Sequence, residues 1–181
     1  MLKDLQSLIP DYAKDIRLNL SGLARNHGLT EQQFYGVLVA TSLATKNETL
    51  IEHTIAEAKQ HLTDVELNAA YAATNIMAMN NIYYRFVHLA KNKSYATKPA
   101  GLRMNVIANP GVEKIDFELM SLAVSAINGC GLCIDSHEKV LIQAGVTEET
   151  IQQAVKIAAV VHAVAQSLVG QHLIALDTQA A

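Results

Sequence analysis

Residues 129–137 read Gly129-Cys130-Gly131-Leu132-Cys133-Ile134-Asp135-Ser136-His137, and they contain both cysteines of the chain. The two glycines around Cys130 predict a tight turn that opens a helix at about residue 131. Cys130 would then lie at the helix N-terminus and Cys133 in the first turn, where the helix dipole favours a thiolate. His137 follows Cys133 by four residues, so a helix places the imidazole and this thiol on one face.

A Cys-x-x-Cys pair has several uses in proteins. Two thiols at this spacing can close and reopen a disulfide without moving the fold, and a nearby imidazole can take or return a proton near pH 7. Inert core thiols are the simplest alternative, and the glycines and the histidine on the same face argue against it. A zinc site needs two further ligands, and the chain has no other cysteine and no histidine pair at finger-like spacing. The stretch indicates redox chemistry but leaves its direction open.

Outward from this stretch, helical patterns cover almost the whole chain. The apolar residues are mainly Ala, Leu, Ile and Val, with 5% aromatic residues and no Trp, which suits close helix–helix contact. Thr30, Thr63 and Thr147 each stand between two apolar residues in the pattern of a hydrophobic staple at a helix start. We predict an all-α fold with helices at 3–26, 31–45, 48–60, 64–90, 114–128, 131–144 and 148–176. The intervening residues 91–112 are predicted to be a connector with a short helix at 101–108.

An internal repeat underlies this pattern. A shift of 84 residues places residues of one half on those of the other without a gap: Thr63 on Thr147, His53 on His137, Thr49 on Cys133, Lys46 on Cys130 and Phe34 on Glu118. We predict a single domain over residues 1–181, built from one helical unit used twice. The first copy covers about 30–90, and the second, at about 114–176, alone carries the redox residues. His53 is expected to be structural.

Length and charge exclude several other classes. A chain of 181 residues can bury a core as one domain. Its 14 basic and 17 acidic side chains form no basic run, so we expect no nucleic-acid partner. The N-terminus has no signal-peptide core, and uncharged stretches such as 119–134 fall short of a membrane span, so we expect no membrane association. Two thiols in a chain expected to be cytoplasmic are more often catalytic than structural.

Glu118 is nearly the only charge in an apolar run over 117–124. The carboxylate lies either in an exposed first helical turn, where the helix dipole favours it, or in the interior with a partner. If the helices before and after Gly129 pack antiparallel, Glu118 can approach His137. No Lys or Arg occurs between residues 115 and 138, so we expect a proton relay, rather than a fixed cation, to activate the thiol.

The segment from Phe117 to Glu138 resembles the active-site signature of the alkyl hydroperoxidase D family, within the carboxymuconolactone decarboxylase-like superfamily. Its Glu-x11-Cys-x2-Cys-x3-His spacing carries the resemblance, and two upstream segments add to it, Leu102-Arg103-Met104 and Asn109-Pro110-Gly111. The resemblance implies an all-helical fold with an internal repeat, usually assembled as a homotrimer.

The resemblance also implies roles for single residues. Cys133 would attack the peroxide and become a sulfenic acid, and Cys130 would be the proton donor and resolving thiol that closes the disulfide. His137 and Glu118 would complete a proton relay. Relatives often carry His just before the second cysteine, where this chain has Leu132, so an auxiliary hydrogen bond and the partner preference are in question at this position.

The activity implied is that of an antioxidant thiol peroxidase acting on organic hydroperoxides. No bound cofactor is expected. Electrons would come from dihydrolipoamide or another lipoyl group on a lipoyl-bearing protein, and the enzyme would also reduce a partner peroxiredoxin of the alkyl hydroperoxide reductase C type.

Two other functions were weighed for the same residues. One is a non-peroxidatic dithiol–disulfide adaptor or redox sensor, which would relay electrons between proteins. The other is the decarboxylase chemistry of the superfamily on a lactone, which needs no dithiol and fits the intact cysteine pair poorly. We further predict a homo-oligomer with the dithiol open to a partner, because the helices at 64–90 and 148–176 carry more apolar surface than one chain covers.

Overall fold

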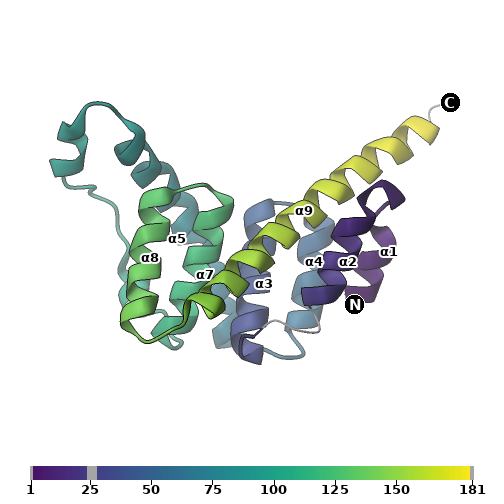
Figure 1. Cartoon of the computed structure of the whole chain (residues 1–181), viewed down its shortest axis with the longest axis horizontal. Helices are drawn as coiled ribbons and strands as arrows, with labels where there is room; N and C mark the ends of the chain where they lie inside the picture. The colour runs from purple at the N-terminus through teal and green to yellow at the C-terminus, as the bar shows by residue number, and fades with distance from the viewer. Residues whose placement is uncertain (1, 24–27, 180–181) are drawn as a thin grey trace.

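The computed structural model describes residues 2–23 and 28–179. These residues form helices and connecting turns, without a strand, so the all-α prediction is confirmed for the described part of the chain (Figure 1). In chain order the elements are α1 (Leu2–Leu8), the 3-10 helix η1 (Asp11–Ala13), α2 (Lys14–Leu23), α3 (Glu31–Thr45), α4 (Glu48–Ala58), α5 (Asp64–Leu89), the 3-10 helix η2 (Lys93–Thr97), α6 (Asn105–Ala108), α7 (Lys114–Ile127), α8 (Gly131–Gln143) and α9 (Glu148–Gln179).

The three predicted threonine caps are present. The hydroxyl of Thr30 accepts a hydrogen bond from the main chain three residues later, at 3.2 Å, and Thr63 does the same at 3.4 Å. Both belong to capping boxes, in which the side chain at the third helical position bonds back to the cap residue. Thr147 accepts from the main-chain N–H of Thr150 at 3.3 Å. These bonds satisfy main-chain donors that a helix start leaves free.

The predicted helix at 3–26 is wrong as one element. Pro10 has no N–H to continue the helical hydrogen bonds, and its ring disfavours helical geometry in the residue before it. The chain therefore ends α1 at Leu8, makes the short η1, and starts again in α2, which runs to Leu23. Residues 24–26 of that prediction lie outside the described part. The other long helices agree with prediction to within three residues, whereas the short helix is confined to α6 and η2 was not foreseen.

The core lies around α3 and α7, which pack against each other and are each flanked by α5 and α9. Side chains that are at most 1% exposed fill this contact, among them Val37, Val39, Leu119, Leu122 and Ile157. Outside this centre, α4 covers α3, and α8 covers α7 and α5. Figure 1 shows α8, α7 and α5 at one side of the molecule and α4, α2 and α1 at the other, with α9 crossing between them.

Helix positions agree with the predicted repeat. Under the shift of 84 residues, α3, α4 and α5 start within one residue of α7, α8 and α9. The contacts correspond as well, since α3 packs on α4, α5 and α9 while α7 packs on α8, α9 and α5. The superposition of the two units in space stays a prediction.

One helix, over Glu148–Gln171, is long and apolar enough to cross a membrane by length and composition alone. The sequence analysis overlooked this segment in favour of the shorter run at 119–134. Half of its most apolar window is buried inside the fold, where α9 contacts α2, α3 and α7. The same composition is typical of a core helix, and the packing accounts for it.

Candidate active site

The turn between α7 and α8 places both cysteines. Gly129 has a φ of +65°, a conformation that costs glycine little because it has no Cβ. The main-chain N–H of Cys130 then donates to the carbonyl of Ser125 at 3.1 Å, which closes the end of α7. Cys130 is the N-cap residue of α8 and Cys133 is the third residue of that helix, as predicted. The two form a disulfide, with their Cα atoms 5.3 Å apart.

Three polar side chains hold this turn against α5. The amide of Asn81 donates to the hydroxyl of Ser125 at 2.9 Å, and the amide of Asn128 donates to Oδ1 of Asn81 at 2.9 Å. The guanidinium of Arg85 donates to the carbonyl of Asn128 at 2.6 Å. Because α5 is anchored to the residues just before Cys130, the disulfide has a fixed position relative to α5.

Glu118 and His137 meet inside the fold. Nδ1 of His137 lies 2.6 Å from Oε2 of Glu118, and the two residues are only 8% and 3% exposed. Of the two alternatives for Glu118, the interior with a partner is correct, because α7 and α8 pack on each other after the Gly129 turn. A short bond between a carboxylate and a ring N–H fixes the orientation of the imidazole.

The other ring nitrogen of His137 faces a thioether rather than a cysteine. Nε2 lies 3.2 Å from Sδ of Met77, a residue of α5 that is 1% exposed. His137 and Cys133 line the same cavity from the same helix, as the i,i+4 spacing predicts. In this disulfide form, the hydrogen-bond partners of the ring within the described part are Glu118 and Met77. Proton exchange with Cys133 therefore requires a ring rotation or one bridging water.

A cavity of about 470 Å³ opens onto Cys133. One part of its wall is polar, formed by Asn80, Glu118, Cys133 and His137. Another part is apolar, formed by Met104, Ile107, Leu132 and Val140. The connector before α7 thus supplies part of the wall. A cavity with a reactive sulfur, convergent polar groups and apolar walls suits a small organic molecule with one polar end.

The predicted opening of the dithiol to a partner is wrong for this disulfide form. Cys130 is 0% exposed and Cys133 only 6%. Cys133 lines the cavity, whereas Cys130 is not among the lining residues. The helix N-terminus that orients the pair also lies beneath side chains of α5 and α6, so the sulfur of Cys133 is reached through the cavity.

The sequence analysis missed three residues of this cavity. Met77 was treated as simple core packing, and Asn80 was not considered, yet both line the cavity beside Cys133. Lys114 also lines it, one residue before the range in which no cation was found, so a positive charge does border the site. The repeat holds a signal for Asn80, since the matching position in α9 is the apolar Val164.

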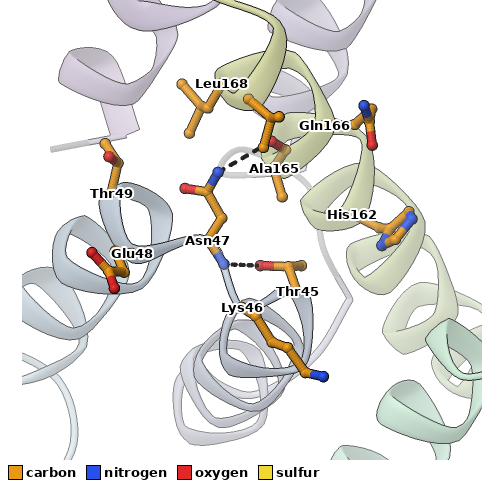
Figure 2. Close-up of a pocket in the computed structure, with 10 residues that line it drawn as sticks. Thr45, Lys46, Asn47, Glu48, Thr49, His162, Ala165, Gln166 and Leu168 are labelled. Atoms are coloured by element: carbon orange, nitrogen blue, oxygen red, sulfur yellow. Dashed lines mark hydrogen bonds between the residues drawn. The ribbon is translucent and has the colours of Figure 1, made fainter. Parts of the chain in front are cut away.

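A second cavity, of about 460 Å³, lies between the α3–α4 turn and α9 (Figure 2). Lys46 and Thr49, the repeat partners of the two cysteines, line it. The side-chain amide of Asn47 donates to the carbonyl of Ala165 at 3.2 Å and ties the turn to α9. The ring of His53 bonds the carbonyl of Thr49 in its own helix at 2.8 Å. The residues that line this cavity include no thiol, so the redox pair belongs to one half only.

This architecture defines a class: an all-helical oxidoreductase with a Cys-x-x-Cys disulfide beside a buried carboxylate–imidazole pair. Residues 94–171 match the family model described as the carboxymuconolactone decarboxylase family. Proteins named alkyl hydroperoxide reductase AhpD match almost the whole chain. The chain therefore belongs to the AhpD-like family and is an enzyme of the oxidoreductase class.

The relatives come from several bacteria. The protein from Rhodopseudomonas palustris (strain BisA53) is 63% identical over 164 residues, which is 91% of this chain and 91% of the relative. The protein from Brucella anthropi is 58% identical over 167 residues, 92% of this chain and 95% of the relative. The protein from Azorhizobium caulinodans is 56% identical over 167 residues, covering 92% of each chain.

Proposed function

We propose that this protein reduces organic hydroperoxides through a dithiol–disulfide cycle of Cys133 and Cys130. One observation carries the proposal: Cys133 lines an apolar-walled cavity next to the buried pair of Glu118 and His137. The names of the relatives, alkyl hydroperoxide reductase AhpD, support the same substrate class.

The first step is attack on the peroxide. The carboxylate of Glu118 accepts the Nδ1–H of His137, which leaves Nε2 able to take the thiol proton of Cys133, directly or through one water. The thiolate then attacks the terminal oxygen of the hydroperoxide, and the O–O bond breaks. Cys133 becomes a sulfenic acid, and the alkoxide leaves as an alcohol with the proton returned by His137.

The second step closes the disulfide. The sulfur of Cys130 attacks the sulfur of the sulfenic acid, an S–S bond forms, and the hydroxyl leaves as water with the proton of the Cys130 thiol. The Cα separation of 5.3 Å lies in the usual range for a disulfide, so the cycle needs little movement of the main chain.

The third step is reduction, for which we propose dihydrolipoamide as the donor. A lipoyl thiolate would attack Cys133, because this sulfur lines the cavity whereas Cys130 is 0% exposed. Cys130 leaves as a thiolate at the N-terminus of α8, where the dipole favours the negative charge. The second lipoyl thiol then displaces Cys133, which returns both cysteines to the reduced state and leaves lipoyl disulfide.

Buried sulfurs also constrain the protein partners. A lipoyl group on a lipoyl-bearing protein is a long, narrow arm that can enter a cavity. We propose that a peroxiredoxin of the alkyl hydroperoxide reductase C type is a second partner, which would present its disulfide on an equally narrow segment. We also propose that these reactions occur in the cytoplasm.

Exposed apolar residues on α5 support assembly into a homotrimer. Ile82, Phe86 and Leu89 follow one another at helical spacing and are 67%, 52% and 69% exposed. Apolar side chains gathered on one helix face are typical of subunit contacts.

The direct test is hydroperoxide loss with dihydrolipoamide as the reductant. We expect turnover by the intact protein and none by Cys133→Ser. A protein that exchanges its disulfide with dihydrolipoamide but does not consume hydroperoxide would be a dithiol–disulfide adaptor, and the peroxidase proposal would be rejected.

A further inference from the structure

Asn80 is buried in the active-site cavity with an unused hydrogen-bond acceptor. The residue is 4% exposed, and its Oδ1 has no hydrogen-bond partner among the described residues. A buried polar atom without a partner is costly for a fold, so its presence needs a reason. Asn80 lines the same cavity as Cys133, Glu118 and His137. The reason we consider is a ligand that enters this cavity.

The placement of Asn80 relative to the sulfur is specific. Its main-chain carbonyl oxygen lies 4.0 Å from Sγ of Cys133. Within the helix, Asn80 is one turn after Met77, which contacts His137, and one turn before Tyr84, which also lines the cavity. A group bonded to the amide of Asn80 would therefore lie close to both the sulfur and the relay.

The repeat shows that the fold does not need a polar side chain here. The matching position in α9 is Val164, which is 0% exposed and belongs to the apolar core. The other polar groups of the redox cavity are already engaged, since Glu118 and His137 bond each other. Of the buried side-chain oxygens that line the cavity within the described part, Oδ1 of Asn80 is the one without a partner.

We propose that Oδ1 of Asn80 accepts a hydrogen bond from the terminal O–H of an organic hydroperoxide and so positions that oxygen for attack by Cys133. This inference rests on the proposed peroxidase function. A hydroperoxide has a single O–H donor, on the terminal oxygen that the thiolate attacks. The bond breaks between the two oxygens, the terminal O–H stays on sulfur as the sulfenic acid, and the alkoxide takes its proton from His137.

The same contact orients the rest of the substrate. With the O–H held at Asn80, the organic group extends to the apolar wall of Met104, Ile107, Leu132 and Val140. Burial of carbon against this wall adds binding energy that hydrogen peroxide does not gain. Asn80 thus acts on the reacting end of the substrate, and the apolar wall acts on its tail.

The test compares two reagents in the Cys130→Ser background, in which Cys133 reacts alone. Tert-butyl hydroperoxide carries the O–H donor, whereas methyl methanethiolsulfonate reacts with a thiolate and has no such donor. The ratio of their second-order rate constants with Cys133 reports the hydrogen bond, because changes in thiol acidity or access affect both reagents. The variants are Asn80→Leu, which removes the acceptor, and Asn80→Asp, which retains it. Asn75→Leu, at an exposed position of α5 outside this cavity, is the matched control.

We expect Asn80→Leu to lower this ratio about tenfold, the scale of one lost hydrogen bond to substrate. Asn80→Asp and Asn75→Leu should keep the ratio within about twofold. An unchanged ratio in Asn80→Leu would overturn the inference and leave the peroxidase proposal intact. If the parent protein reacts with the thiosulfonate but not with the hydroperoxide, both are rejected. Should Asn80→Leu lose its helical circular dichroism, Asn80→Ala provides the same comparison.

Discussion

Nδ1 of His137 and Oε2 of Glu118 lie 2.6 Å apart in the interior, although the residues are 19 positions apart in sequence and belong to different helices. The contact exists because α7 and α8 reverse direction at Gly129 and pack against each other. Burial strengthens this interaction, since little water competes for the carboxylate or the ring. The pair is thus a fixed proton acceptor and donor beside Cys133.

Loss of either member of the pair should slow turnover. We expect Glu118→Gln and His137→Gln each to lower kcat/KM for hydroperoxide by about 10²-fold, the usual scale for acid–base assistance. His53→Gln is the matched control, because His53 occupies the equivalent position of the first half and bonds only its own helix. Steady-state assays with dihydrolipoamide measure the effect. Full activity in both site variants would leave the helix dipole as the sole activator of the thiol.

Cys133 should be the sulfur that peroxide oxidises. In Cys130→Ser, one equivalent of hydroperoxide is expected to give a sulfenic acid on Cys133, which a dimedone probe and peptide mass spectrometry locate. In Cys133→Ser the buried Cys130 should remain unlabelled, because it does not line the cavity. Label on Cys130 instead would reverse the two roles.

Leu132 should influence which hydroperoxides are preferred. It is 38% exposed and contributes to the apolar wall, where relatives often carry His. We expect Leu132→His to lower kcat/KM for cumene hydroperoxide about threefold to tenfold, since an apolar contact is exchanged for a polar ring. The value for hydrogen peroxide, which has no organic group, should change less than twofold. Equal losses for both substrates would show that Leu132 acts on the thiols and not on the tail.

The exposed face of α5 should be a subunit contact. Light scattering of the parent protein is expected to give three times the chain mass of 19.6 kDa. Phe86→Glu combined with Leu89→Glu should shift the mass towards the monomer, because two charges would be buried at the contact. Leu18→Glu, at an exposed apolar position of α2, is the control and should leave the mass unchanged. A parent protein of 19.6 kDa would exclude an oligomer at the concentration measured.

Asp116 should make stability depend on pH. Burial raises the pKa of Asp116 above its ordinary value of 3.8, and Glu113 and Glu66 add to the rise, against the hydrogen bond from Gln33. The folded state therefore binds the proton more tightly than the unfolded chain does. This contribution to stability is complete below the unfolded pKa and is lost as the pH rises through the folded pKa.

Asp116→Asn removes the ionisable group and retains an oxygen that can accept from Gln33. We expect its thermal midpoint to exceed that of the parent at pH 7, where Asp116 is ionised, and to match it near pH 3, where both residues are neutral. Asp15→Asn, at an exposed position, is the control. An advantage of the same size at both pH values would show that ionisation of Asp116 is not its cause.

Local interactions explain what could be predicted from the sequence. Thr30, Thr63 and Thr147 form caps within their own helices, so the starts of α3, α5 and α9 follow from neighbouring residues. The turn at Gly129 and the disulfide of Cys130 and Cys133 are equally local. The break at Pro10 was also local, and it was missed because the apolar pattern continues past the proline.

The rest of the site depends on contacts between distant segments. Nothing near Met77 or Asn80 in the sequence distinguishes them from ordinary helix residues, and they become site residues only because α5 packs against α7 and α8. Whether Glu118 was exposed or buried could not be decided from one helix, because both alternatives satisfy its charge. The burial of Cys130 likewise follows from side chains that other helices contribute.

The sequence by itself therefore determined the helical class, the helix starts, the redox pair and the family resemblance, since each depends on residue types within a few turns of one another. Only the tertiary structure decided that Glu118 bonds His137, that Cys133 is reached through a cavity, and that Asn80 has a free acceptor beside it. Burial and long-range contact are properties of the packed chain, because the exclusion of water at one residue depends on side chains from several helices.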